Sequence, residues 1–348
     1  MGGSGRVLWL DAAKGLGISL IVIGHVWSLS DPPLFYLWLF AFHVPLFFFI
    51  SGMTFKVKQA STAAVLAEKS YRLITPYIWF ALLGYALYLA GYFATGSMSE
   101  RPDQFDYGLW VPLVGILYGT AGEGYLVNSP LWFLPALLVT YTLAYVINAY
   151  LPSKATQFAA TAGLMMIGLF INEQIRLPWG IVPALIAVGF FQTGHWMMQT
   201  SLIRKLQSHH ALIAGVVLLL ASLLAPINGA VGLAGPTVNN PALFIIFAFI
   251  GTGACISWVY ALPVRLQHGL ALIGRHSLAI LVTHMLIIKG IKVILQFTTG
   301  WTFTSMEVSS LQGLVVLLLT IISLLIAIPL IRRIAPFTLA ERKGPAFG

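Results

Sequence analysis

The sequence predicts an all-α polytopic membrane protein of about ten transmembrane helices with both termini in the cytoplasm. Three observations predict this fold class. Of the 348 residues, 59% are hydrophobic and only 8% are charged, whereas a soluble surface normally needs about 25% charged residues. Apolar runs long enough to cross a bilayer recur along the chain. The few lysines and arginines fall almost entirely on one side of these runs.

The predicted spans follow from length, because a membrane helix needs about 20 mainly apolar residues. The runs that meet this requirement cover residues 12–29, 33–55, 71–94, 131–151, 155–171, 179–198, 211–227, 242–261, 269–288 and 311–331. The run 109–119 is too short to cross and is expected to be interfacial or re-entrant. No repeat of 20–50 residues is visible. The prediction is therefore a single membrane domain over residues 1–348.

The distribution of positive charge predicts the orientation, since lysine and arginine concentrate in cytoplasmic loops. With the N-terminus inside, nearly all of the 19 basic residues are cytoplasmic. The exceptions expected outside are Arg101, Arg176, Lys289 and Lys292. Most Asp and Glu residues fall outside in the same scheme, so the acidic residues agree with this topology.

Several other protein classes are excluded by the same composition. A chain this apolar is not intrinsically disordered. A single cysteine, Cys255, permits no intramolecular disulfide, which excludes a secreted disulfide scaffold. The net charge of +9 is spread along the whole chain and forms no basic stripe, so no nucleic-acid partner is expected. Membrane lipids are the expected surroundings.

The first predicted span carries ionisable residues that lipid would not tolerate. Insertion of such a group costs about 2.5–3.5 kcal/mol, so these side chains are expected to face a protein interior or a cavity. Asp11, Lys14 and His25 share one face of the helix, because 11 residues correspond to nearly whole turns. His25 lies about 16 Å along the axis from Lys14. The alternative for Asp11 and Lys14 is a simple ion pair at the helix end.

Two more histidines are expected at a similar depth. His43 lies about 18 Å above the inner end of the second span, and His284 about 22 Å along the ninth. An intramembrane histidine can also serve only to hydrogen-bond a neighbouring helix, so this alternative stays open for all three. The remaining histidines that fall near cytoplasmic loops are expected to be solvated or interfacial: His195, His209, His210 and His268.

The chemistry that these residues suit is proton abstraction by an imidazole. No histidine pair has the i,i+4 spacing of a metal site, and no carboxylate lies within a span beside them, so no metal is expected. The sequence has no glycine-rich phosphate loop and no nucleophile elbow. A histidine whose pKa lies near neutrality is the usual general base in such a setting.

Three passages resemble the membrane acyltransferase 3 family, especially its fucose 4-O-acetylase-like branch. The first helix, from Leu10 to His25, has a basic residue and a histidine separated by ten positions, as in the family. The stretch from Ala41 to Gly52 is similar to the family's second-helix signature, and Arg72 to Tyr77 to its third-helix entry. Weaker similarities are Leu131 to Pro135, and Gly274 to Leu278 followed by His284.

The resemblance implies an O-acyltransferase that moves an acyl group, usually acetyl, from cytosolic acyl-CoA to a hydroxyl of an envelope or exported polysaccharide in a bacterial inner membrane. Acetyl-CoA would be a co-substrate and no cofactor would stay bound. The acceptor would be a saccharide, free or lipid-linked. His25 matches the family's catalytic histidine and Lys14 its basic partner. The full expectation is His25, Lys14 and Asp11 for catalysis, Lys14, Arg72 and Arg275 for the donor, and His43, His284, Trp132 and Glu123 for the acceptor.

Several interpretations compete with this one. Lys14 stands where many family members have arginine, which makes phosphate contacts less secure because lysine lacks the guanidinium fork. Lys56, Lys58 and Lys69 near Arg72 also suit an ordinary positively charged loop. The outer loop that carries Glu123 equally suits a solvated loop. A transporter or flippase for a lipid-linked saccharide would use the same intramembrane histidines, and a membrane sensor or scaffold would need no chemistry. Oligomeric state is left open.

Overall fold

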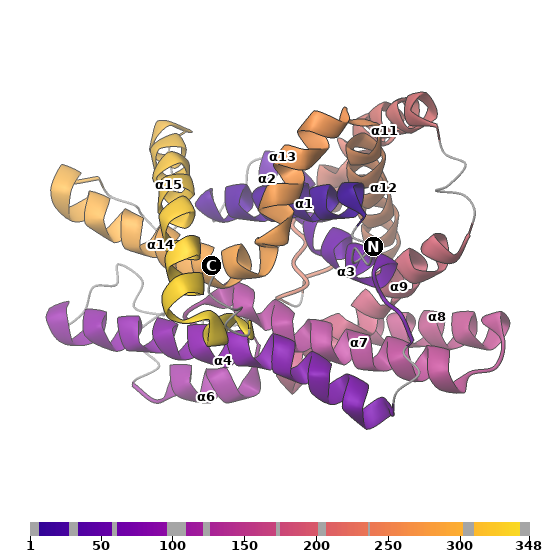
Figure 1. Cartoon of the computed structure of the whole chain (residues 1–348), viewed down its shortest axis with the longest axis horizontal. Helices are drawn as coiled ribbons and strands as arrows, with labels where there is room; N and C mark the ends of the chain where they lie inside the picture. Colours follow the sequence, from indigo (N-terminus) through magenta and orange to yellow (C-terminus); the bar gives the residue numbers. More distant parts are fainter. Residues whose placement is uncertain are drawn as a thin grey trace, which may run out of the picture.

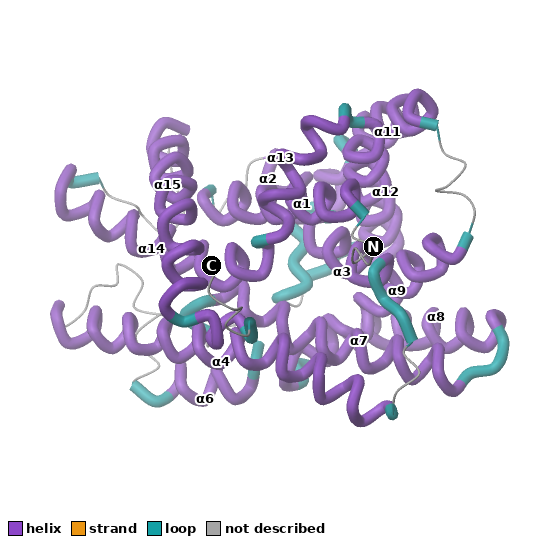
Figure 2. The backbone as a smooth tube through the Cα atoms, in the orientation of Figure 1, coloured by secondary structure: helices purple, strands orange, loops and turns teal. Residues whose placement is uncertain are grey.

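The computed structural model of the chain describes residues 7–27, 34–57, 61–95, 109–120, 126–171, 175–200, 207–235, 237–301 and 310–341. Within these ranges the protein is helical and has no strand, apart from one isolated antiparallel bridge between Gly232 and Thr237 (Figure 2). Ten helical segments of the described chain are long and apolar enough to cross a membrane. The predicted fold class is therefore confirmed, while the orientation of the termini stays a prediction.

The helices occur in the following order along the chain. The first half contains α1 (Leu8–Val26), α2 (Leu34–Phe40), α3 (His43–Met53), α4 (Thr62–Thr95), α6 (Val111–Tyr118), η2 (Ser129–Trp132), α7 (Phe133–Tyr150) and α8 (Lys154–Ile171). The second half contains η3 (Pro178–Gly180), α9 (Ile181–Gln199), α11 (Ser208–Ser222), η4 (Ala225–Asn228), α12 (Pro241–Ala261), α13 (Val264–Arg275), α14 (Ser277–Thr299), α15 (Ser310–Ile334) and η5 (Pro336–Leu339). The short α6 agrees with the expectation that 109–119 does not cross the membrane.

The second span is broken into α2 and α3, where the sequence predicted a continuous helix. The break falls at Ala41 and Phe42, immediately before His43. Pro45 explains it, because proline has no N–H to donate to the carbonyl four residues earlier and its ring clashes with that carbonyl. Proline is tolerated in the first turn of α3, where N–H groups have no helical partner. The break places His43 at the start of a helix.

The ninth span differs from the prediction of 269–288. Residues Val264–Arg275 form the separate amphipathic helix α13, and the membrane-length helix α14 begins at Ser277. The separation follows from the polar residues of α13, since Arg265 and His268 lie on its exposed side. The register therefore moves by eight residues: His284 lies about 10 Å from the start of its helix, and Lys289 and Lys292, predicted in an outer loop, lie within the span.

The first helix packs against helices from both ends of the chain. In Figure 1, α13 lies beside α1, with α4, α6, α7 and α8 along one edge and α11 and α12 towards the other. α1 contacts α3, α12, α13, α14 and α15. The spans formed by α8, α11 and α15 are only 22% buried, against 61% for α1. Because the side chains on the outer helices are apolar and exposed, these helices are the ones that would face lipid.

Close backbone contact holds α1 against α13. A Cβ at Gly15 would overlap the carbonyl oxygen of Leu270, and a Cβ at Gly274 would overlap that of Asp11. Small residues permit such approaches in membrane proteins, where van der Waals packing is a main source of helix association. The crossing brings the C-terminal end of α13 next to the beginning of α1.

Candidate active site

The histidines of three separate helices meet at the C-terminal half of α1. The rings of His25 and His284 have centroids 5.3 Å apart with an interplanar angle of 45°. The ring of Phe40 lies beside both His25 and His43, with its centroid 6.2 Å from the first and 4.4 Å from the second. Residues distant in sequence therefore form one cluster, which we call the histidine cluster and which consists of His25, His43 and His284.

Backbone hydrogen bonds fix two of these imidazoles. His43 Nδ1 lies 3.0 Å from the carbonyl oxygen of Leu39, and His284 Nδ1 lies 2.9 Å from that of Ile280. A carbonyl only accepts, so in both rings Nδ1 carries the proton and donates it. Nε2 is then left as the acceptor in each neutral ring. His284 is fully buried and its Nε2 has no hydrogen-bond partner.

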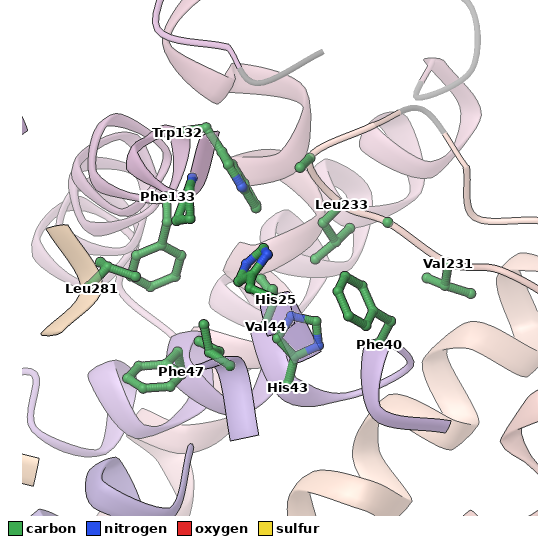
Figure 3. Close-up of a pocket in the computed structure, with 14 residues that line it drawn as sticks. His25, Phe40, His43, Val44, Phe47, Trp132, Phe133, Val231, Leu233 and Leu281 are labelled. Carbon is green, nitrogen blue, oxygen red and sulfur yellow. The ribbon is translucent and has the colours of Figure 1, made fainter. Parts of the chain in front are cut away.

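A pocket opens beside the histidine cluster (Figure 3). Its volume, counted together with its open mouth and the solvent space there, is about 650 Å³. His25 and His43 lie at its centre, and Trp132 at the end of η2 and Phe133 at the start of α7 form one wall. The other lining residues are Ile21, Phe40, Val44, Phe47, Pro130, Val231, Gly232, Leu233, Ala234 and Leu281. Imidazoles are thus the only ionisable groups in an otherwise apolar and aromatic wall.

A second group of polar residues gathers at the opposite end of α1. Lys14 Nζ lies 3.6 Å from Asp11 Oδ1, and Arg275 Nε lies 3.9 Å from Asp11 Oδ2. Asp11 is buried, but neither cation lies within hydrogen-bond distance of it. We call these three residues the charged cluster. It contains the ion pair between Asp11 and Lys14 that the sequence offered as the alternative, and it adds Arg275, which the contact between α1 and α13 brings there.

The two clusters occupy separate places. From Lys14 to His25 the axis of α1 runs for about 16 Å, and the residues of α1 that line the pocket are Ile21 and His25. This separation along α1 is the one that the sequence predicted, and Asp11 and Lys14 do not line the pocket. What the two clusters share is the helix that carries both.

The other predicted site residues are distributed as follows. Trp132 lines the pocket as expected for an acceptor contact. Arg72 lies on the exposed side of α4 and pairs with Glu68 at 2.9 Å, and Lys69 lies over the ring of Tyr141, so the donor role of Arg72 stays a prediction. Glu123 and Lys58 lie outside the described residues.

One histidine lies in a different environment from the predicted one. His195 was expected to be solvated or interfacial, but it is buried in α9, where its ring contacts Phe55 and its Nε2 lies 2.7 Å from Gln199 Nε2. The reason is that α9 packs closely against α3, where Gly194 approaches the backbone of Phe49, and α3 covers this position. His209, His210 and His268 are exposed, as expected.

Two lysines near the histidine cluster were not predicted there. Lys292 donates to the carbonyl oxygen of Val26 at 3.2 Å, and Lys289 to that of Val127 at 2.7 Å. Lys292 therefore caps the C-terminal end of α1, where carbonyl groups lack helical partners. Two lysines after an apolar run are normally taken as the end of a span, and only the later start of α14 reveals that they lie within it.

His276, between α13 and α14, adjoins the charged cluster but is not part of it. Burial and the positive charge of Arg332 lower its pKa below the ordinary value, Glu341 raises it, and Arg275 lowers it further. The imidazole is accordingly neutral near pH 7 and adds no charge to the cations beside it.

Comparison with known proteins supplies one match. The model of the acyltransferase 3 family, described as an acyltransferase domain, matches residues 7–332. Searches of curated proteins and of solved structures found no significant match. The matched region includes both clusters, the pocket and all ten candidate spans up to α15. The chain is an integral multi-pass membrane protein that belongs to the acyltransferase 3 family, and its activity is the transfer of acyl groups.

Proposed function

We propose that the protein is an O-acetyltransferase of the bacterial inner membrane. It would move the acetyl group of cytosolic acetyl-CoA to a sugar hydroxyl of an envelope or exported polysaccharide, with His25 as the general base. The observation that carries this proposal is the position of His25. Its imidazole lines a pocket with aromatic walls in a chain whose family transfers acyl groups.

The chemistry requires a base because a sugar hydroxyl is a weak nucleophile. Neutral His25 accepts the hydroxyl proton while the oxygen attacks the thioester carbonyl carbon. The tetrahedral intermediate then collapses: the C–S bond breaks, the ester is formed, and the leaving thiolate takes the proton from the imidazolium. The products are the acetylated sugar and free CoA thiol. His25 returns to its neutral form. The reaction therefore consumes only acetyl-CoA and the sugar.

The charged cluster suits the anionic part of the donor. Asp11 is held by Lys14 and Arg275 at 3.6 and 3.9 Å, outside hydrogen-bond distance. Both cations therefore retain donors that a phosphate can use, and phosphate pairs with arginine in the bidentate geometry that the guanidinium fork favours. Asp11 would keep the two side chains in place when the donor is absent.

The pocket suits a saccharide better than a lipid tail. Trp132 and Phe133 present aromatic surface on one side of His25, and His43 has an Nε2 acceptor because its Nδ1 donates to Leu39. A sugar has apolar ring faces and hydroxyl donors, which this combination can bind. The fucose 4-O-acetylase-like branch is the relationship we propose within the family.

The test is acetyl transfer by the purified protein in lipid vesicles. Labelled acetyl-CoA is the donor, and the saccharide fraction of membranes from a strain that lacks the gene is the acceptor probe. His25→Ala is expected to reduce both label transfer and thiol release by at least about 100-fold. The matched control is His195→Ala, which removes another buried membrane histidine outside the pocket lining. Equal rates for the parent and His25→Ala would contradict the role of His25.

The same assay addresses the other functions that the sequence left open. A transporter or flippase would move saccharide in response to an ion gradient and would release no CoA thiol, and a sensor would do neither. Direct transfer also predicts that the protein keeps no label after incubation with donor alone. A stable acetylated histidine under those conditions would replace direct transfer with an acyl-enzyme mechanism.

A further inference from the structure

His284 presents a buried acceptor atom that nothing satisfies. The side chain is fully buried, its Nδ1 donates to Ile280 at 2.9 Å, and its Nε2 has no hydrogen-bond partner. An acceptor left unpaired in a low-dielectric interior costs about 1–3 kcal/mol. The Nδ1 bond to Ile280 fixes the ring, so Nε2 stays unpaired unless a donor reaches it. The cost of the unpaired Nε2 indicates that a donor does so at some stage of the reaction.

The nearest imidazole with a proton to donate is that of His25. The two ring centroids are 5.3 Å apart and the planes are tilted by 45°. A hydrogen bond between them is not formed in this arrangement, but rotation of the His25 ring about its side-chain bonds can direct one nitrogen towards His284. The other nitrogen of His25 then faces the pocket that the side chain lines.

The position of His284 excludes it as the base for the acceptor. It is fully buried and is not among the residues that line the pocket, whereas its helix neighbour Leu281 is. A sugar hydroxyl in the pocket therefore meets His25 and does not reach His284. Any effect of His284 on the reaction has to pass through His25.

We infer that His284 is a positioning residue. Its Nε2 accepts a hydrogen bond from one N–H of His25 and so selects the tautomer of His25 whose other nitrogen has its lone pair towards the pocket. This inference rests on the proposed function. When His25 takes the hydroxyl proton, the imidazolium keeps its donor bond to His284, and the proton from the hydroxyl later leaves with the thiolate. No proton is transferred to His284.

The test compares two replacements of His284 in the full-length protein. His284→Leu removes the acceptor and keeps an apolar side chain, while His284→Gln restores an acceptor through its amide oxygen. We expect the leucine variant to lower kcat about 10- to 100-fold, the range expected for the loss of one buried hydrogen bond, with both KM values within about twofold. The glutamine variant is expected to recover most of that loss. His195→Leu and His195→Gln are the matched controls.

Three results would overturn the inference: a leucine variant with the parental kcat, equal losses in the leucine and glutamine variants, or a loss that lies in the KM of the acceptor. If His284→Leu does not yield monodisperse protein with a parental melting temperature, His284→Met removes the imidazole acceptor with a more adaptable side chain and is judged by the same criteria. His25→Ala separates this test from that of the proposed function. If His25→Ala is inactive while His284→Leu is fully active, only the role of His284 fails.

Discussion

The two ends of α1 carry different kinds of polar group. The first turns carry Asp11 and Lys14, with Arg275 arriving from α13, and the cations keep part of their surface exposed. The last turns carry His25, which faces other imidazoles and aromatic rings. The first end therefore carries an ion cluster in contact with solvent. The last end carries imidazoles that can exchange a proton, and its only nearby cations among the described residues are Lys289 and Lys292, which donate to backbone carbonyls.

This difference agrees with the surroundings of the two ends, of which the first is partly exposed and the last lies beside an apolar pocket. A charge far from water is costly unless it is paired, so fixed cations belong where solvent or a phosphate can reach them. A histidine can stay neutral in an apolar pocket and still accept a proton when a hydroxyl reacts. If the proposed function holds, one helix would separate recognition of the anionic donor from acid–base chemistry, and substitutions at its two ends are expected to have different kinetic signatures.

The largest effect is expected where the crossing of α1 and α13 assembles the charged cluster. Gly274→Ala forces a methyl group into the carbonyl oxygen of Asp11, whereas Gly269→Ala, on the same helix, meets open space. We expect Gly274→Ala to destabilise the protein by about 1–3 kcal/mol through overpacking. Gly269→Ala should be neutral or stabilise it by about 0.5–1 kcal/mol, because alanine favours the helix. Thermal melting in detergent measures both, and equal melting temperatures would mean that the crossing is looser than described.

Removal of either cation should affect donor binding and leave the chemical step intact. Lys14→Gln and Arg275→Gln are each expected to raise the KM for acetyl-CoA about tenfold, equivalent to the loss of about 1.4 kcal/mol, with little change in kcat. Lys154→Gln, at the start of α8, is the matched control because Lys154 is exposed and bonds only to Gln199 in the described contacts. A fall in kcat without a change in the KM for acetyl-CoA would place Lys14 in the chemistry and would remove the distinction between the two ends.

A smaller effect is expected from the pocket wall. Trp132→Leu removes aromatic surface beside His25 and keeps an apolar side chain. The KM for the saccharide acceptor should rise about threefold to tenfold, in keeping with about 0.5–1.5 kcal/mol for an aromatic contact, while the KM for acetyl-CoA stays unchanged. Initial rates over a range of acceptor concentrations provide the measurement. An equal rise in both KM values would indicate that this wall also holds the donor.

The smallest effect concerns His276 and pH. Burial and Arg332 lower the pKa of this imidazole in the folded protein, so the unfolded chain, in which histidine titrates at about 6.5, binds the proton first as the pH falls. Stability should therefore decline as the pH falls below about 6.5. His276→Gln removes this contribution, and the melting temperature of the variant should fall less than that of the parent between about pH 7.5 and about pH 5.5. A decline equal to that of the parent would show that other groups control the acid sensitivity.

Much of the fold was predictable because a membrane limits the solutions. Length and hydropathy were sufficient for eight of the ten spans to within about four residues at each end, since only a helix satisfies its own backbone in lipid. The helix α4 begins at Thr62, nine residues before the predicted start at 71. The positions at which helices break were harder to predict from the sequence. Pro45 is compatible with the division at residues 41–42, but the continuous aromatic and apolar residues around it favoured one uninterrupted span. The start of α14 was misplaced because the apolar residues of α13 extended the run.

The candidate site was predictable where one helix determines it and unpredictable where packing does. The spacing of Lys14 and His25 follows from helix geometry alone. The approach of His284 to His25 and the arrival of Arg275 at Asp11 depend on how α14 and α13 pack against α1. Helix periodicity contains no information about such contacts. Resemblance to a family pointed to these residues before the structure placed them.

The length of α1 between Lys14 and His25 fixes the distance between the charged cluster and the histidine cluster. An α-helix is stiff along its axis, and the contact of Gly15 and Gly274 with backbone atoms ties α1 to α13. For a donor held at both ends of α1, the reach from its anionic group to its thioester must then match about 16 Å. Insertion of one helical turn would keep Lys14 and His25 on nearly the same face of α1 and lengthen the distance between them by about 5.4 Å. Donor selectivity would then follow helix length as well as pocket shape.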